Sequence, residues 1–139
     1  MVLIAGNGVI PPLQHPRWIE CGRVDPKNFL EALDLFILPN RTTYYDLVSL
    51  EVMSKGIPIL ASRTGGNISL ARDVPAFKCF EPNVPSLIEG VDSFFNLPEV
   101  TRKSISKDLL NFYHSDFSLE AFGKRYIQTI EQIYKDYGF

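Results

Sequence analysis

Short, mainly apolar runs alternate with amphipathic segments along this chain. The apolar runs lie at residues 2–5, 18–21, 34–38, 57–61 and 77–80. Continuous apolar runs of this length are typical of strands that are covered on both faces of a parallel sheet. Strands that alternate with helices specify a parallel α/β sheet with right-handed crossovers. The pattern therefore predicts one α/β domain over residues 1–139, with a parallel sheet flanked by helices.

Capping and breaking residues place the helices between these runs. Asp25 followed by Pro26 predicts a helix over 25–33, with an N-cap and a proline at its first position. Gly56, with a proline shortly after it, ends a helix predicted over 46–55. A short helix is predicted over 68–72. From residue 85 the chain is predicted to be helical, with breaks at 96–98 and 115–118 and an amphipathic last helix whose apolar residues are Leu119, Phe122, Tyr126, Ile130, Ile133 and Tyr137.

The composition is that of a soluble globular protein. The net charge of −2 argues against a broad surface for nucleic acid or anionic membranes, although backbone amides can still form one phosphate site. Cys21 and Cys79 lack metal-ligand spacing and are expected to be buried, reduced thiols. No run is long enough for a membrane span, so we expect a cytoplasmic protein.

The helix predicted at 46–55 begins just past the end of the apolar run 34–38. A helix in this position directs free backbone N–H groups at the crevice above the sheet, which suits a phosphate. The amides of Asp46, Leu47 and Val48 are the candidates. The alternative is that Asp46 simply caps the helix and no ligand lies nearby.

Glu51 lies about one and a half turns into the same predicted helix. Its neighbours are mostly apolar, so we expect a largely buried helix on which a carboxylate needs a partner. A sugar diol would provide one, and so would a lysine. The sequence leaves both alternatives open.

Other candidates have equally ordinary explanations. The turn at Gly65 and Gly66 brings backbone close to a ligand, or is only a tight turn with positive φ. Tyr44 and Tyr45 stack on a sugar, or are common loop tyrosines. The two histidines, His15 and His114, have no nucleophile placed beside them in sequence, and no metal-ligand cluster is present.

Taken together, the motifs resemble the C-terminal, donor-binding half of the retaining family 4 (group 1) glycosyltransferases of GT-B architecture. Leu38-Pro39-Asn40, the block Leu47–Pro58 and Thr64-Gly65-Gly66 follow the order and spacing of that family. The segments 2–8 and 19–24 resemble its preceding strands. The resemblance therefore covers nearly the whole chain and implies a Rossmann-like sheet with a helical C-terminal tail.

The resemblance also implies roles for individual residues. The donor is a UDP- or GDP-linked sugar, transferred with retention and without a metal or other cofactor. Glu51 binds the ribose hydroxyls, the amides of Asp46, Leu47 and Val48 contact the diphosphate, and the 65–66 turn lies close by. The residues implied beside the base are Arg23 and Val24, and those implied near the donor sugar are Thr43, Tyr44 and Tyr45.

The chain departs from the family in two ways. Thr43 stands where the family motif has its first glutamate. The chain also begins at what resembles the second strand, so we expect it to lack the family's first strand and helix, the basic residues they carry and the acceptor domain. We therefore expect negligible turnover without the acceptor domain, and self-association through an uncovered edge or face. In the full-length enzyme, the inner face of the membrane is an alternative location.

Two other functions stay open at this stage. One is a non-catalytic module that binds a sugar nucleotide or acts as a scaffold, which the loss of the first glutamate favours. The other is a nucleotide-sugar epimerase of related fold. The acceptor and the pathway, such as polysaccharide biosynthesis or protein glycosylation, are not given by the sequence.

Overall fold

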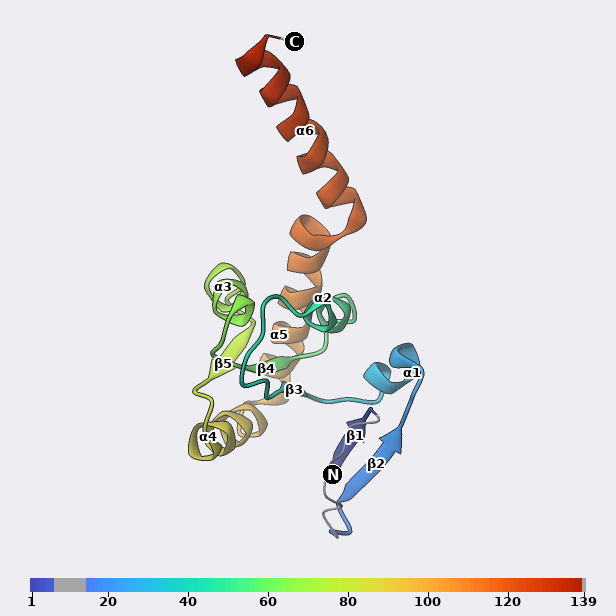
Figure 1. The fold of residues 1–139 in the computed structure, drawn as a ribbon. Helices are drawn as coiled ribbons and strands as arrows, with labels where there is room; N and C mark the ends of the chain where they lie inside the picture. Colours follow the sequence, from blue (N-terminus) through green and yellow to red (C-terminus); the bar gives the residue numbers. More distant parts are fainter. Residues whose placement is uncertain (7–14, 139) are drawn as a thin grey trace. The chain divides into compact units, whose positions relative to one another are not determined.

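A computed structural model describes residues 1–6 and 15–138, which form two compact units, 1–33 and 34–139 (Figure 1). Each unit is described by itself. The segment 7–14, which contains most of the predicted Gly-Asn-Gly turn and the proline-rich stretch after it, lies outside the described residues. The prediction of one domain stays a prediction.

The first unit contains a parallel pair of strands and one short helix. Strands β1 (Val2–Ala5) and β2 (Trp18–Gly22) pair with Val2 opposite Trp18. Helix α1 (Pro26–Glu31) begins as predicted, because Asp25 accepts a hydrogen bond from the backbone N of Lys27 at 3.3 Å. The helix ends two residues earlier than the pattern indicates.

The second unit is built on a three-stranded parallel sheet. Its strands are β3 (Phe36–Leu38), β4 (Ile59–Ser62) and β5 (Lys78–Phe80), with β4 in the middle. Strand β4 starts later than predicted. Pro58 has no N–H to give to the ladder, although its carbonyl oxygen accepts a hydrogen bond from the Phe36 N at 2.8 Å.

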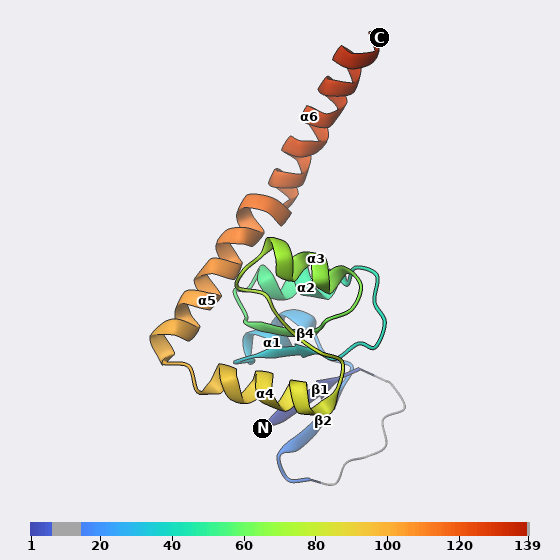
Figure 2. The same cartoon turned by 90° about the vertical axis from the view of Figure 1, so that its left-hand side faces the viewer.

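Helices cover both faces of this sheet. Helices α2 (Leu47–Met53) and α3 (Gly66–Asp73) lie on one face, and α4 (Val84–Phe95) lies on the other (Figure 2). A Cβ at Gly90 of α4 would lie 2.9 Å from the Leu60 side chain, so this helix packs closely on β4. The chain continues through α5 (Glu99–Phe112), a π-helical turn (Tyr113–Phe117) and α6 (Leu119–Tyr137).

The core of the second unit surrounds its middle strand. All four residues of β4 are buried, and so are Val52 and Met53 of α2 and Phe77 before β5. The central strand is therefore a fixed platform for the loops at its ends. The predicted α/β class, with parallel sheets flanked by helices and a long C-terminal helix, is confirmed. Across residues 1–6 and 15–138, no helix is both long and apolar enough to cross a membrane.

Candidate functional site

Polar groups gather where the strands of the second unit end. Because the strands are parallel, their carboxyl ends lie at one edge of the sheet, which is where ligands bind in open α/β folds. The Ser62 hydroxyl donates to the carbonyl oxygen of Asn40 at 2.5 Å, and the Thr64 hydroxyl contacts the same oxygen at 3.4 Å. These bonds tie the loop after β3 to the end of β4.

Asp46 is the N-cap residue of α2, but its side chain does not cap the helix. Its side chain makes no capping hydrogen bond to the described backbone, and its Oδ2 instead accepts a bond from Asn40 Nδ2 at 2.7 Å. The Ser49 N–H bonds to the Asp46 carbonyl oxygen at 3.0 Å. The amides of Leu47 and Val48 come before that bond, so they are left without an intrahelical acceptor. The structure therefore shows no side-chain cap at Asp46, and a ligand at this helix start stays a prediction.

Glu51 lies on the exposed side of α2, which corrects the expectation of a largely buried helix. The buried residues of α2 are Ser49, Val52 and Met53, at spacings that place them on one face. Glu51 lies on the opposite face, and its carboxylate makes no hydrogen bond or ion pair with the residues that the structure describes. The lysine alternative is thus not observed. Glu51 is one turn beyond Leu47, which is 69% exposed, so the carboxylate and the first turn share a face.

The Gly-Gly turn supports the loop at residues 43–45. Gly65 has a φ of 47°, and a Cβ on it would collide with the Thr43 carbonyl oxygen. A Cβ on Gly66 would lie 2.7 Å from Tyr45 Cδ2. The Gly66 N–H donates to the Tyr44 carbonyl oxygen at 2.6 Å. Both glycines are therefore required by the approach of the 43–45 backbone, and α3 begins at the second of them.

The residues predicted near a sugar differ in their exposure. Thr43 is 8% exposed, and its hydroxyl oxygen finds no hydrogen-bond partner among the described residues. Tyr44 is 94% exposed. Tyr45 is partly exposed, and its burial, with the Asp73 carboxylate as the smaller cause, raises the pKa of its phenol above the ordinary 10.0. Thr43 thus anchors a loop that presents the two tyrosines.

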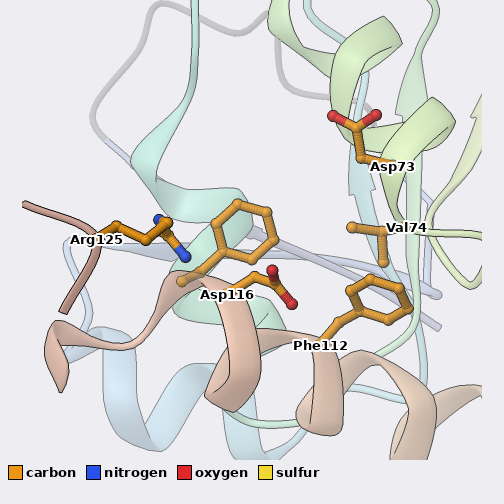
Figure 3. A pocket seen from close by; sticks show the side chains of 6 residues that line it. Asp73, Val74, Phe112, Asp116 and Arg125 are labelled. Atoms are coloured by element: carbon orange, nitrogen blue, oxygen red, sulfur yellow. The ribbon is translucent and has the colours of Figure 1, made fainter. Parts of the chain in front are cut away.

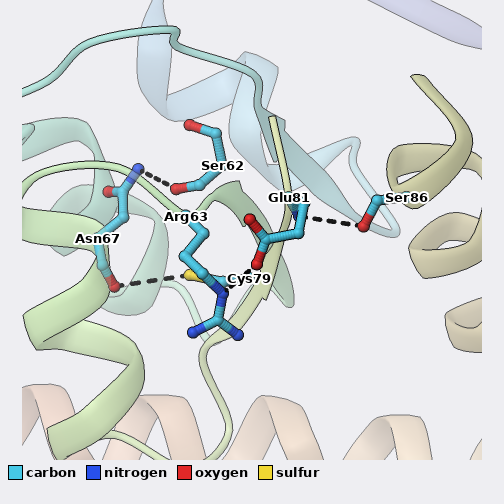
Figure 4. A network of polar contacts seen from close by, with 6 residues as sticks. All are labelled: Ser62, Arg63, Asn67, Cys79, Glu81 and Ser86. Carbon is cyan, nitrogen blue, oxygen red and sulfur yellow. Dashed lines mark hydrogen bonds and ion pairs between the residues drawn. The ribbon is translucent and has the colours of Figure 1, made fainter. Parts of the chain in front are cut away.

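A polar network next to this loop was not predicted from the sequence (Figure 4). Asn67 Nδ2 donates to the Ser62 carbonyl oxygen at 3.0 Å, and Cys79 Sγ contacts the Asn67 carbonyl oxygen at 3.6 Å. Arg63 Nε pairs with Glu81 Oε1 at 2.8 Å. The signal that could have revealed this network is the run of polar residues directly after the ends of β4 and β5.

Both cysteines are free and partly exposed, so the expectation of reduced thiols fits and that of full burial is wrong. Burial raises the pKa of the Cys79 thiol above its ordinary 9.0, and this effect outweighs the attraction of the Arg63 cation for the thiolate. The thiol therefore acts as a neutral packing group at neutral pH.

A hollow of about 320 Å³ lies at the other end of α3, away from the 65–66 turn (Figure 3). Val74 and Phe112 give it an apolar wall, while Asp116 of the π-helical turn and Arg125 of α6 give it polar groups. The residues of the candidate site do not line it. It is a space between helices rather than part of that site.

The remaining candidates lie elsewhere. Arg23 and Val24 belong to the unit 1–33, so their predicted place beside a base stays a prediction. His15 Nδ1 accepts a bond from the Arg17 N at 3.2 Å, and the His114 ring packs edge-on against Tyr113. Within the described ranges, no group of three or more His, Cys, Asp or Glu residues is placed to hold a metal ion.

Comparisons with known proteins now identify the class. Residues 1–95 match the family of glycosyl transferases group 1, and the chain belongs to this family. The chain is 26% identical over 98 residues to an uncharacterized glycosyltransferase of Haemophilus influenzae, a match that covers 69% of this chain and 27% of the relative.

The fold is also similar to that of a solved structure, sucrose-phosphate synthase from Thermosynechococcus elongatus. The TM-score is 0.71 at 19% identity, over 86% of this chain and 31% of the synthase. This likeness confirms the predicted Rossmann-like, GT-B type of fold. The chain spans about a quarter of the length of the curated relative and under a third of the synthase. Membership of family 4 and retention stay predictions.

Proposed function

We propose that this chain is the donor-binding part of a glycosyltransferase and binds a nucleoside diphosphate sugar. The amides of Asp46, Leu47 and Val48 hold the diphosphate, and Glu51 accepts hydrogen bonds from the ribose hydroxyls. Tyr44 and Tyr45 contact the donor sugar, while Thr43 anchors their loop. Family membership supports the class of reaction.

One observation carries the assignment of this site. The helix start that follows β3 is left uncapped by Asp46, and Glu51 lies on the same exposed helix face as Leu47. A ligand with an anionic group and a diol about one helical turn apart matches these two features. A nucleoside diphosphate has both groups.

The chemistry of transfer follows from the placement of these groups. When the sugar leaves, negative charge develops on the diphosphate, and fixed backbone N–H groups stabilise it without reorganising. Transfer also needs an acceptor held in line and shielded from water. The donor-binding residues supply neither, so we expect this chain to bind a donor with negligible turnover. In the longer enzyme we expect retention at the anomeric carbon, with a UDP- or GDP-linked donor.

Calorimetric titration tests this proposal. UDP, GDP and sugars linked to them should be titrated into the chain and into Glu51→Ala. Loss of hydrogen bonds to a charged group costs about 1.5–3 kcal/mol, so binding should weaken by roughly 10- to 100-fold. Glu89→Ala, which removes an exposed carboxylate from α4 on the opposite face of the sheet, should bind as the unchanged chain does.

Two results would contradict the proposal. Equal affinity of the Glu51→Ala variant and the unchanged chain would remove Glu51 from the site. The absence of binding heat with every nucleotide would favour the scaffold alternative. Thr43, which stands where the family motif has its first glutamate, also points to that alternative. Product analysis with a longer form of the protein separates transfer from epimerisation.

A further inference from the structure

Helix α6 carries an apolar face that the described chain leaves exposed. Among its described residues Ala121 is buried. The rings of Phe122 and Tyr126 stack on this exposed face with their centroids 6.1 Å apart. A continuous apolar stripe of this kind marks an interaction surface. Its exposed members are Leu119, Phe122, Tyr126, Ile127, Ile133 and Tyr137.

The charges of α6 argue against a lipid or nucleic-acid partner. The helix has three acidic and three basic side chains, so its net charge is zero. Helices that bind anionic membranes have an excess of Lys and Arg on the polar face. A neutral helix with an aromatic-rich stripe fits a protein partner better. Its charged residues are Glu120, Lys124, Arg125, Glu131, Lys135 and Asp136.

The charges along one flank of α6 alternate in sign. When two copies of this flank run in opposite directions, each charge can therefore face an opposite one. Glu120, Lys124, Glu131 and Lys135 fall within about 60° of arc on the same side of the apolar stripe. In an antiparallel pair centred between residues 127 and 128, position 120 faces position 135 and position 124 faces position 131. Both pairings then join opposite charges.

A parallel pair would use the charges less well. In a parallel, in-register pair this flank faces the other flank of the second helix. Glu120 then comes close to Arg125 of the second copy, which is an opposite-charge contact, but Glu131 comes close to Asp136, a like-charge contact that offsets it. On this flank only the antiparallel pair joins opposite charges throughout, so the charge pattern favours the antiparallel direction.

We propose that α6 pairs in an antiparallel manner with α6 of a second copy of this chain. The apolar stripe supplies the attraction, and the four flanking charges set direction and register. This surface is separate from the donor site, so the two proposals stand or fall independently.

Sedimentation equilibrium of the whole chain over a range of concentrations tests this proposal. We expect a dimer, and about tenfold weaker association for Lys124→Glu and for Glu131→Lys, because two exposed ion pairs per dimer become repulsive. The double variant, which carries both changes, should regain most of the original association.

The double variant separates pairing between helices from effects within one helix. Glu120 and Lys124 are four residues apart, as are Glu131 and Lys135. The two substitutions together place like charges at both of these spacings, so an effect confined to one helix predicts that the double variant associates most weakly. Recovery of association is expected only if position 124 faces position 131 of the second copy.

Lys107→Glu provides the matched control for Lys124→Glu, since it makes the same charge change at an exposed position of α5. It should leave association unchanged, and circular dichroism should show equal helicity for all variants. A monomer at every concentration would overturn the proposal, and so would a double variant weaker than either single one. Equal weakening by Lys107→Glu would also overturn it, because the effect would then be one of net charge.

Discussion

The side-chain amide of Asn40 holds the carboxylate of Asp46, with Asn40 Nδ2 and Asp46 Oδ2 2.7 Å apart. An aspartate at this position would ordinarily turn toward the first amides of the helix. The bond to Asn40 restrains it, and α2 starts without a side-chain cap. The side-chain amide of Asn40, in the loop after β3, therefore engages the carboxylate that could otherwise cap the next helix.

Replacing Asn40 with alanine should close that helix start. The released Asp46 carboxylate can bond to the first amides of α2, where it competes with and repels an anionic ligand. We expect the Asn40→Ala variant to bind UDP and GDP about tenfold more weakly by calorimetry.

The double variant Asn40→Ala/Asp46→Ala should recover affinity, because it lacks the competing carboxylate. Asn111→Ala, at an exposed position of α5, serves as the control. If the double variant binds as weakly as Asn40→Ala alone, competition by Asp46 is not the cause.

Gly65 should tolerate no side chain. An alanine there would have to adopt the φ of 47° and would collide with the Thr43 carbonyl oxygen. We expect Gly65→Ala to lower the free energy of unfolding by about 3 kcal/mol, measured by urea denaturation. Gly123→Ala is the matched control, since open space surrounds that position in α6. It should raise helix stability by about 0.5–1 kcal/mol, and a loss there comparable to that at Gly65 would contradict this account.

The thiol of Cys79 should make stability depend on alkaline pH. Its pKa in the folded chain is raised by burial above the ordinary 9.0, so the native state keeps a proton that the unfolded chain has released. This contribution to stability is complete below pH 9 and is lost as the pH rises through the higher, folded-state pKa. The free energy of unfolding, measured at pH 8 to 10.5, should fall less steeply for Cys79→Ala than for the unchanged chain. Cys21→Ala is the comparison variant, and an unchanged slope in Cys79→Ala would remove the thiol as the cause.

Local signals in the sequence predicted most of the elements. Asp25 with Pro26, and Gly56, act through the backbone next to them, so the helix ends that they mark were found close to the predicted positions. The start of α3 was missed by two residues because Gly65 and Gly66 read as a turn. The same two glycines also form the start of the helix, since Gly65 is its N-cap and Gly66 is the first residue of α3.

The side-chain contacts of the site could not be predicted in the same way. The bond between Asn40 and Asp46 depends on how the loop folds back after β3, and no periodicity encodes that. Glu51 was expected on a buried helix because its sequence neighbours are apolar. Those neighbours are distributed around the helix, and one face of α2 packs against the core while Glu51 lies on the other.

The contact of Gly65 and Gly66 with the loop at 43–45 has a consequence for how this protein can change. The course of that loop is set by backbone atoms, through one hydrogen bond and two positions that exclude a side chain. The side chains of Tyr44 and Tyr45 can therefore be exchanged without rerouting the chain. The backbone of this loop can keep its course while these two side chains change. A new preference for the bound sugar could therefore be engineered or could evolve without a change of fold.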